Sequence, residues 1–294
     1  KEFISNYNVG ELEGFSPIEK GIENSNYLIK AGGKKYIFTI FENRVENADL
    51  PFFMRLTSHM QSKGINCPVT LANKSGSQLN DVKGKKAALI SFLEGADVEE
   101  VEDFHVVELG KTLAKMHLAV ADFKEARKNQ FALAKWVDLL SKIGERANEL
   151  KVGLMQELAE EIQFLAANWP FDLPSGVIHA DLFPDNVFFK DGKLSGVIDF
   201  YFSATDHFAY DIAICINAWG MESSKARQKL FLDAYNGVRK LSDAELAAMP
   251  VLLRGAAMRF LMTRLYDWFN TPANALVKKK DPLDYYKKLK VWQF

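Results

Sequence analysis

The chain has 294 residues, and its 37 basic and 38 acidic side chains give a formal net charge of -1 at pH 7. Hydrophobic residues make up 48% and charged residues 26%, which is typical of a globular protein. The balanced charge argues against non-specific binding to nucleic acid or to an anionic membrane. We also find no uninterrupted apolar run of the roughly 18 residues expected of a membrane span.

The start of the chain and its cysteines point to the cytoplasm. The first residues, KEFISNYNVGELEG, lack the basic and apolar regions of a signal peptide. Cys67 and Cys215 do not have the spacing of a metal site. We therefore expect two free thiols in a cytoplasmic protein.

The first third of the chain has the residue pattern of strands. Residues 25–30 and 35–41 are rich in β-formers and flank AGG, which predicts a hairpin. Residues 50–63 predict a helix that ends before Gly64. A further strand is expected at 86–93.

The remainder of the chain is mostly helical by its pattern. Leu109, Leu113, Met116 and Val120 recur at spacings of three and four, which predicts one apolar helix face. Ser242 is a candidate cap for a short helix, and Pro250 is expected to start a longer one. The predicted helices span 104–120, 133–150, 152–169, 243–249 and 250–269. We expect a small β-rich lobe over residues 1–93 and a large helical lobe over residues 94–294.

A polar octet, HADLFPDN at residues 179–186, lies between apolar stretches in the helical region. It is followed by a predicted hairpin, with strands at 187–190 and 194–200 around the turn Asp191-Gly192. If the hairpin folds back, Asn186 and Asp199 come to the same end of it. Together with Asp181 they would offer oxygen atoms to a hard cation such as Mg²⁺. Phosphoryl transfer uses such a set, with one aspartate to accept the hydroxyl proton and an Asn and an Asp to hold the metal.

Structural roles could explain the same residues one at a time. Loop aspartates often form Asx turns, and His179 is expected to be a buried structural histidine. An isolated His-x-Asp pattern is common. The combined pattern of H-x-D-x-x-x-x-N, a strand, a DG turn and I-D-F is much more specific, so we favour a catalytic role.

This combined pattern resembles the catalytic segment of aminoglycoside-phosphotransferase-like kinases, which are relatives of protein kinases. The helix segment from Gly110 to His117 resembles a further motif of that superfamily. Within it, the chain is most similar to homoserine kinases. The similar segments are GIENSNYLI, FTIFE, LPFFMRL, GVIHADLFPDNVFF, IDFYFSATD, YDIAICINAW and RFLMTRLYDWFNTP. They cover nearly the whole chain.

The resemblance implies an α+β, two-lobed protein-kinase-like fold with ATP and Mg²⁺ as cofactors. The implied reaction is direct, in-line phosphorylation of the L-homoserine hydroxyl, which serves threonine biosynthesis. Asp181 is then the catalytic base, Asn186 and Asp199 hold Mg²⁺, and His179 and Asp211 support the catalytic loop. The implied nucleotide-binding residues are Asn24, Ser25, Asn26 and Thr39 at the phosphates, and Ser91, Phe92 and Leu93 at the adenine.

The sequence departs from protein kinases at the phosphates. Thr39 stands where a phosphate-pairing Lys is usual, and the helix LPFFMRLTSHM has no acidic partner for such a Lys. Lys34, Lys35 and Arg44 are the nearby cations that could meet the phosphates.

The substrate carboxylate of homoserine calls for an Arg, because a guanidinium binds carboxylates through two hydrogen bonds. The candidates for substrate binding are Asp206, Asn217, Arg259 and Arg264. Arg259 and Arg264 are five residues apart, so at most one of them should face a given pocket.

Three other functions stay open on the sequence. The same fold could phosphorylate another small alcohol, such as choline, an aminoglycoside or a thioribose. The missing Lys would also suit a non-catalytic nucleotide-binding module. A metal-dependent hydrolase could use His179, Asp181, Asp199 and His207 as ligands. The oligomeric state is not predicted.

Overall fold

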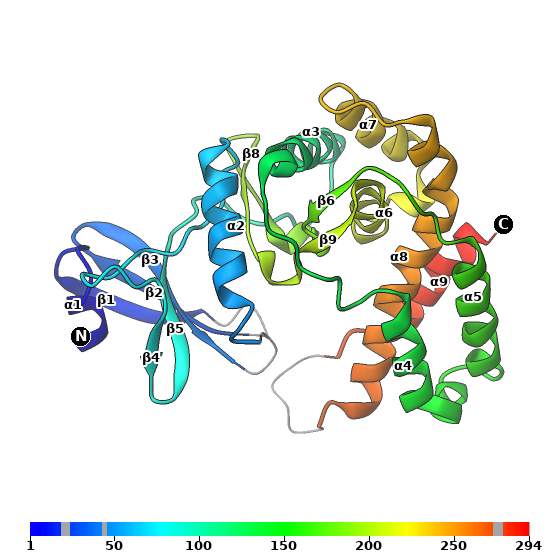
Figure 1. Ribbon diagram of the computed structural model, residues 1–294, viewed down its shortest axis with the longest axis horizontal. Coiled ribbons are helices and arrows are strands. Elements are labelled where there is room, and N and C mark those ends of the chain that lie inside the picture. The colour runs from blue at the N-terminus through cyan, green and yellow to red at the C-terminus, as the bar shows by residue number, and fades with distance from the viewer. Residues whose placement is uncertain (19–23, 43–45, 273–278, 294) are drawn as a thin grey trace. The chain divides into compact units, whose positions relative to one another are not determined.

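The polypeptide passes three times between two structural units. The first unit consists of Lys1–Asp97 and Val187–Tyr201, and the second consists of Val98–Asn186 and Phe202–Phe294. The computed structural model describes the chain except residues 19–23, 43–45, 273–278 and 294 (Figure 1). The expected division between residues 93 and 94 stays a prediction.

An antiparallel sheet forms the centre of the first unit, with the strand order β1-β2-β3-β5-β4. Gly32 and Gly33, both with positive φ, form the tight turn of the predicted hairpin between β2 and β3. That hairpin is confirmed. The strands span Leu12–Ile18 (β1), Asn24–Ala31 (β2), Lys34–Phe41 (β3), Asn80–Val82 (β4) and Lys85–Ser91 (β5).

Two helices accompany the sheet, α1 (Glu2–Ser5) and α2 (Leu50–Ser62). Helix α2 starts with a Pro in its first turn and is followed by Gly64 at a φ of 83°, as its sequence predicts. Leu50 and Met54 of α2 pack with Phe41 and Ala88 of the sheet in one buried cluster. Burial of each large apolar side chain contributes about 1.5–3 kcal/mol to stability.

The hairpin that follows the polar octet belongs to the first unit. Its strands are β7 (Val187–Lys190) and β8 (Lys193–Val197), and the turn between them has positive φ at Asp191 and Gly192, as predicted. Phe189 exchanges two backbone hydrogen bonds with Ala96, and the Val197 N–H donates to Asn66 O. A Cβ on Gly196 would lie 2.5 Å from Asn66 O, so the close approach of these chains requires a glycine.

Helices dominate the second unit, together with a two-stranded antiparallel pair of β6 (Ser175–Ile178) and β9 (Ala204–His207). Helix α8 packs against α4, α5, α6 and α9, and nearly every residue of α6 is buried. The helices are α3 (Asp103–Ala119), α4 (Leu133–Ile143), α5 (Leu154–Asn168), α6 (Phe208–Ala218), α7 (Lys225–Asn236), α8 (Asp243–Asn270) and α9 (Pro282–Trp292).

Helix α8 corrects one prediction. The sequence predicted separate helices before and after Pro250, but one helix runs through it. Pro250 removes one backbone hydrogen bond, and the residues around it offset that cost because most of the helix that follows is buried. Helix α8 is long and apolar enough to cross a membrane by length and composition, yet 61% of its apolar window is buried inside the protein, as in a core helix.

A second correction concerns residues 133–150, which were predicted as one helix. Helix α4 ends at Ile143, and Gly144–Glu149 continue as a 3-10 helix. Gly144 adopts a φ of 56°, which an α-helix cannot accommodate.

Candidate active site

The octet loop begins directly after β6 with a backbone conformation that needs support. Ala180 has a φ of 65°, a left-handed conformation that costs a non-glycine residue about 1–2 kcal/mol. The Asp211 carboxylate accepts hydrogen bonds from the N–H groups of His179 (2.8 Å) and Ala180 (2.9 Å). The guanidinium of buried Arg259 donates to the Ala180 carbonyl. Groups outside the loop therefore hold the residue before Asp181 in place.

Asp211 is itself part of a buried network from α3, α6 and α7. Oδ2 of Asp211 lies 3.2 Å from His117 Nε2, and His117 Nδ1 lies 2.7 Å from the Tyr235 hydroxyl. Burial lowers the pKa of His117, so the ring is neutral, with its proton on Nε2 facing Asp211 and Nδ1 accepting from Tyr235. Burial would raise the pKa of Asp211, but the hydrogen bond from His117 and the backbone hydrogen bond from His179 bring it below its usual value. The carboxylate is therefore ionised and suited to bind backbone N–H groups.

Asp181 and Asn186 meet within this loop. The amide nitrogen of Asn186 lies 2.8 Å from Asp181 O and 3.3 Å from Asp181 Oδ2. The Asp181 N–H donates to His179 Nδ1 at 3.3 Å, and His179 is only 2% exposed. Because the amide nitrogen of Asn186 is used by Asp181, the amide oxygen of Asn186 is the atom left to face a cation.

Asp199 belongs to the first unit, whereas Asp181 and Asn186 belong to the second. It follows the hairpin with a φ of 65°, an uncommon conformation for a residue other than glycine. Burial raises the pKa of Tyr201, and the negative charge of nearby Asp199 raises it further. The hairpin pairs Val187 with Val197, so Asn186 and Asp199 flank its open end along the chain. That both residues hold one metal stays a prediction.

The expected phosphate-side residues lie together in the first unit. Thr39, which is 2% exposed, donates to Asn26 Oδ1 at 2.7 Å. Glu42 links the neighbouring residues, since its N–H donates to Asn24 Oδ1 (3.2 Å) and its carboxylate accepts from Ser25 (2.9 Å). The same carboxylate forms an ion pair with Lys85, which was not among the cations suggested by the sequence.

The expected adenine-side segment, Ser91-Phe92-Leu93, ends β5. Ser91 exchanges hydrogen bonds with Val69, one of them through the Ser91 hydroxyl at 2.9 Å. Lys35 Nζ lies 4.9 Å from the centre of the Phe92 ring and 3.4 Å from Glu94 Oε1, so this cation is engaged beside the segment. Lys34 is exposed where β3 begins, and Arg44 lies outside the described residues.

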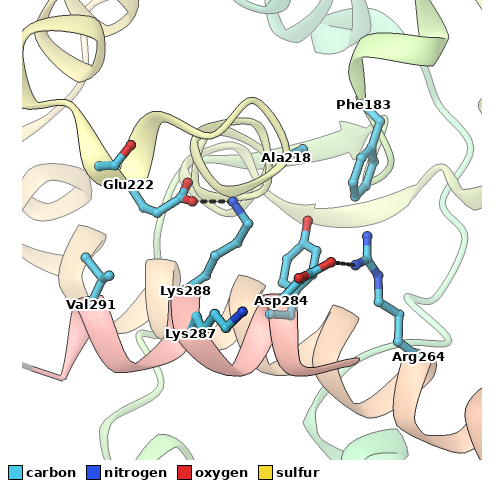
Figure 2. Close-up of a pocket in the computed structure, with 10 residues that line it drawn as sticks. Phe183, Ala218, Glu222, Arg264, Asp284, Lys287, Lys288 and Val291 are labelled. Carbon is cyan, nitrogen blue, oxygen red and sulfur yellow. Dashed lines mark hydrogen bonds and ion pairs between the residues drawn. The ribbon is translucent and has the colours of Figure 1, made fainter. Parts of the chain in front are cut away.

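A cavity of about 530 Å³ opens next to the octet loop within the second unit (Figure 2). Arg264 lines it, and Asp206 and Asn217 do not. Sequence analysis missed most of the other lining residues, which come from α9 and from the segment after α6. The lining residues are Phe183, Ala218, Glu222, Ser223, Arg264, Asp284, Tyr285, Lys287, Lys288 and Val291.

Asp206 and Asn217 bind other parts of the protein. Asp206 Oδ2 accepts from the Asn129 amide at 2.7 Å. Asn217 is fully buried, donates to Ala213 O and Leu253 O, and accepts from the Trp292 indole at 2.9 Å. These contacts give both residues a structural role between helices and loops.

Known proteins are similar to this chain over most of its length. The model of the phosphotransferase enzyme family matches residues 14–248. The homoserine kinase of Agrobacterium fabrum is 50% identical over 294 residues, covering 99% of this chain and 91% of that protein. The homoserine kinase of Rhizobium rhizogenes is 49% identical, covering 99% of this chain and 92% of that protein.

Solved structures share the fold at low sequence identity. The amicoumacin kinase hAmiN, in complex with AMP-PNP, Ca²⁺ and its ligand, superposes with a TM-score of 0.75 at 17% identity and covers 99% of this chain and 90% of its own. The choline kinase of Cryptosporidium parvum gives a TM-score of 0.71 at 17% identity, with 98% and 93% covered. The expected α+β, protein-kinase-like fold is thereby confirmed.

Proposed function

The chain belongs to the phosphotransferase enzyme family, and we propose that it transfers the γ-phosphate of ATP to the side-chain hydroxyl of L-homoserine. The observation that carries this proposal is the 50% identity with a homoserine kinase across 99% of the chain. The product, O-phosphohomoserine, is an intermediate of threonine biosynthesis. Both cysteines are free and buried, which is in keeping with the cytoplasm as the expected compartment.

Asp181 is the proposed base. In the reaction, the substrate hydroxyl oxygen forms a bond to the γ-phosphorus while the bond between that phosphorus and the bridging oxygen breaks, and ADP leaves. The hydroxyl proton passes to an Asp181 carboxylate oxygen. The fixed backbone at Ala180 and the amide of Asn186 hold this carboxylate in one orientation, which lowers the entropic cost of reaching the transition state.

Asn186 and Asp199 are the proposed Mg²⁺ ligands. One amide oxygen and one carboxylate are the hard oxygen donors that Mg²⁺ prefers, and few protein ligands suffice because the ATP phosphates and water supply the others. When bound, the ion neutralises charge on the phosphates. The residues of this chain contribute by fixing those oxygens, and the Asn186 amide is held by its two contacts with Asp181.

In the first unit we propose that Asn24, Ser25, Asn26 and Thr39 face the ATP phosphates, and that Ser91, Phe92 and Leu93 face the adenine. The hydrogen bond that Thr39 donates to Asn26 supports a fixed arrangement at the phosphates. In protein kinases a Lys occupies the position of Thr39 and pairs with the phosphates. Lys85 is an additional candidate for this cation, since its ion pair with Glu42 lies beside Ser25.

The other functions have less support. The hydrolase alternative needed His179, Asp181, Asp199 and His207 around one metal, but the part of the chain that the structure describes has no group of three or more His, Cys, Asp or Glu side chains that could hold a metal ion. Kinases that act on other alcohols remain as alternatives to be tested directly, because solved structures of this fold include amicoumacin and choline kinases.

Coupled ADP release with Mg-ATP tests the proposal against L-homoserine, D-homoserine, L-serine, choline and kanamycin. We expect turnover with L-homoserine, and a loss of about 10²- to 10⁴-fold in kcat for Asp181→Asn with ATP binding retained. Turnover with choline or kanamycin alone would contradict the substrate. ATP binding without any acceptor-dependent ADP release would instead favour a non-catalytic module.

A further inference from the structure

The cavity beside Phe183 is lined by charged side chains of both signs. Glu222 and Asp284 contribute two carboxylates, while Arg264, Lys287 and Lys288 contribute three cations (Figure 2). These side chains come from α8, from α9 and from the 3-10 helix Met221–Ser223. A volume of about 530 Å³ is in the usual range of small-molecule pockets, roughly 300–1,000 Å³.

Two residues that line this cavity each have a buried polar atom that, among the described residues, lacks a hydrogen-bond partner. These atoms are Glu222 Oε2 and the Tyr285 hydroxyl. Tyr285 is only 1% exposed, and the other oxygen of Glu222 forms an ion pair with Lys288. Buried polar groups are nearly always paired in native proteins, so these two atoms take their partners from what fills the cavity, water or a ligand.

The guanidinium of Arg264 is held in the cavity by weak contacts. It lies 3.3 Å from Asp281 O and 3.8 Å from Asp284 Oδ2, and the Asp284 side chain is 57% exposed. An ion pair at this distance with a solvent-exposed carboxylate contributes little. The Tyr285 ring lies 4.5 Å below the guanidinium carbon and fixes its position. Arg264 can therefore exchange Asp284 for the carboxylate of a ligand and gain two hydrogen bonds.

The cavity adjoins the proposed base. Phe183, which lines it, donates its N–H to Asp181 O at 2.9 Å. The pKa of Tyr285 is raised mainly by burial, Arg264 opposes the rise, and the negative charge of Asp181 adds to it. The carboxylate of Asp181 is thus within electrostatic reach of the Tyr285 hydroxyl.

We propose that this cavity recognises the zwitterionic backbone of a hydroxyl-bearing amino acid, with Glu222 Oε2 and the Tyr285 hydroxyl binding the ammonium group and Arg264 binding the carboxylate. This inference rests on the proposed function and assigns its substrate pocket. Lys288 fixes the Glu222 carboxylate, and the amino-acid side chain is left to extend along Phe183 toward Asp181. The pocket selects against alcohols that lack either charged group.

Two analogues separate the charged groups in an experiment. 4-Hydroxybutyrate lacks the ammonium group, and 3-amino-1-propanol lacks the carboxylate. Their competitive inhibition constants against L-homoserine are measured for the wild type, Glu222→Gln and Arg264→Gln. The surface variants Glu160→Gln and Arg227→Gln repeat the same substitutions outside the cavity and should stay within about threefold of the wild type.

The expected result is a crossed pattern. Glu222→Gln raises the KM for L-homoserine and the inhibition constant of 3-amino-1-propanol by about 10- to 100-fold, but leaves that of 4-hydroxybutyrate within about threefold. Arg264→Gln raises the KM for L-homoserine and the inhibition constant of 4-hydroxybutyrate, but leaves that of 3-amino-1-propanol nearly unchanged. The KM for ATP stays unchanged in both. Tyr285→Phe removes only the hydroxyl and should weaken 3-amino-1-propanol more than 4-hydroxybutyrate, so it carries the test if Glu222→Gln does not fold.

The two proposals fail in different ways. Suppose that the wild type phosphorylates L-homoserine, but each variant raises both inhibition constants equally or changes neither of them. The pocket assignment is then wrong and the function stands. If the wild type does not phosphorylate L-homoserine, the function and the pocket assignment are both wrong. Thermal unfolding and binding of a fluorescent ATP analogue identify variants that fail to fold.

Discussion

Replacing Asp211 by Asn tests what holds the catalytic loop. The two oxygens of the carboxylate accept the N–H groups of His179 and Ala180 at 2.8 Å and 2.9 Å, and Oδ2 also contacts His117. An Asn of the same shape offers one oxygen and one NH₂ group. One of the two backbone N–H groups of the loop then faces another donor.

The size of the effect follows from those contacts. A hydrogen bond to a charged group contributes about 1.5–3 kcal/mol, and one such bond is lost in a fully buried place. We expect the free energy of unfolding to fall by about 2–4 kcal/mol. Ala180 loses part of the support for its φ of 65°, so Asp181 shifts, and kcat should fall about 10²-fold while the KM for ATP is kept.

Urea unfolding followed by tryptophan fluorescence gives the first quantity, and coupled ADP release gives the second. Asp233→Asn is the matched control, because Asp233 is an exposed partner of Lys229 on α7 and its loss should cost less than about 0.5 kcal/mol. An Asp211→Asn variant with the unfolding midpoint and kcat of the wild type would refute the view that this carboxylate positions the loop.

Three further predictions concern acid stability, helix packing and metal. Burial lowers the pKa of His117 below 6.5, so just below pH 6.5 the unfolded chain binds more protons and stability should fall as the pH falls. Urea midpoints at about pH 7.5 and pH 5.5 should differ less in His117→Gln, and an equal difference contradicts this. In Gly110→Ala, the new Cβ would lie 2.5 Å from Phe231 O, so thermal unfolding should show a loss of about 1–3 kcal/mol, whereas Gly237→Ala meets only 3.5 Å contacts and should not. Chelation by EDTA should stop ADP release until Mg²⁺ is restored, and activity that persists in EDTA would contradict a metal requirement.

Elements whose ends have a local chemical cause could be predicted from the sequence. The turns at Gly32-Gly33 and Asp191-Gly192 need positive φ, and glycine or aspartate supplies it. Ser242 caps its helix, accepting a hydrogen bond from the Glu245 N–H. The prediction at Pro250 was wrong because the preference of proline for the first turn of a helix reflects local hydrogen bonding only. Helix α8 continues through it since its neighbours in the second unit bury most of the helix after Pro250.

Some residues of the candidate site could likewise be predicted from a local pattern, and others could not. Asp181 and Asn186 could be found because they share one loop, and a single pattern connects them to Asp199. Glu222, Tyr285 and Lys288 gave no signal, because each looks like an ordinary helical residue in its own segment. The packing of α9 against α8 and against the 3-10 helix Met221–Ser223 brings them to one cavity, and no local pattern encodes these contacts.

The hairpin β7–β8 joins the first unit long after the rest of that unit has been synthesised. Ribosomes add about 5–20 residues per second, so the intervening residues 98–186 take about 5–20 s to appear. Until then, the backbone groups of Ala96 and Asn66 that later bind Phe189 and Val197 lack their strand partners. During synthesis these backbone groups of the first unit therefore stay unpaired until the segment that also carries Asp199 has been made. Truncating the chain at one position cannot produce the complete first unit, because Val98–Asn186 of the second unit interrupts its sequence.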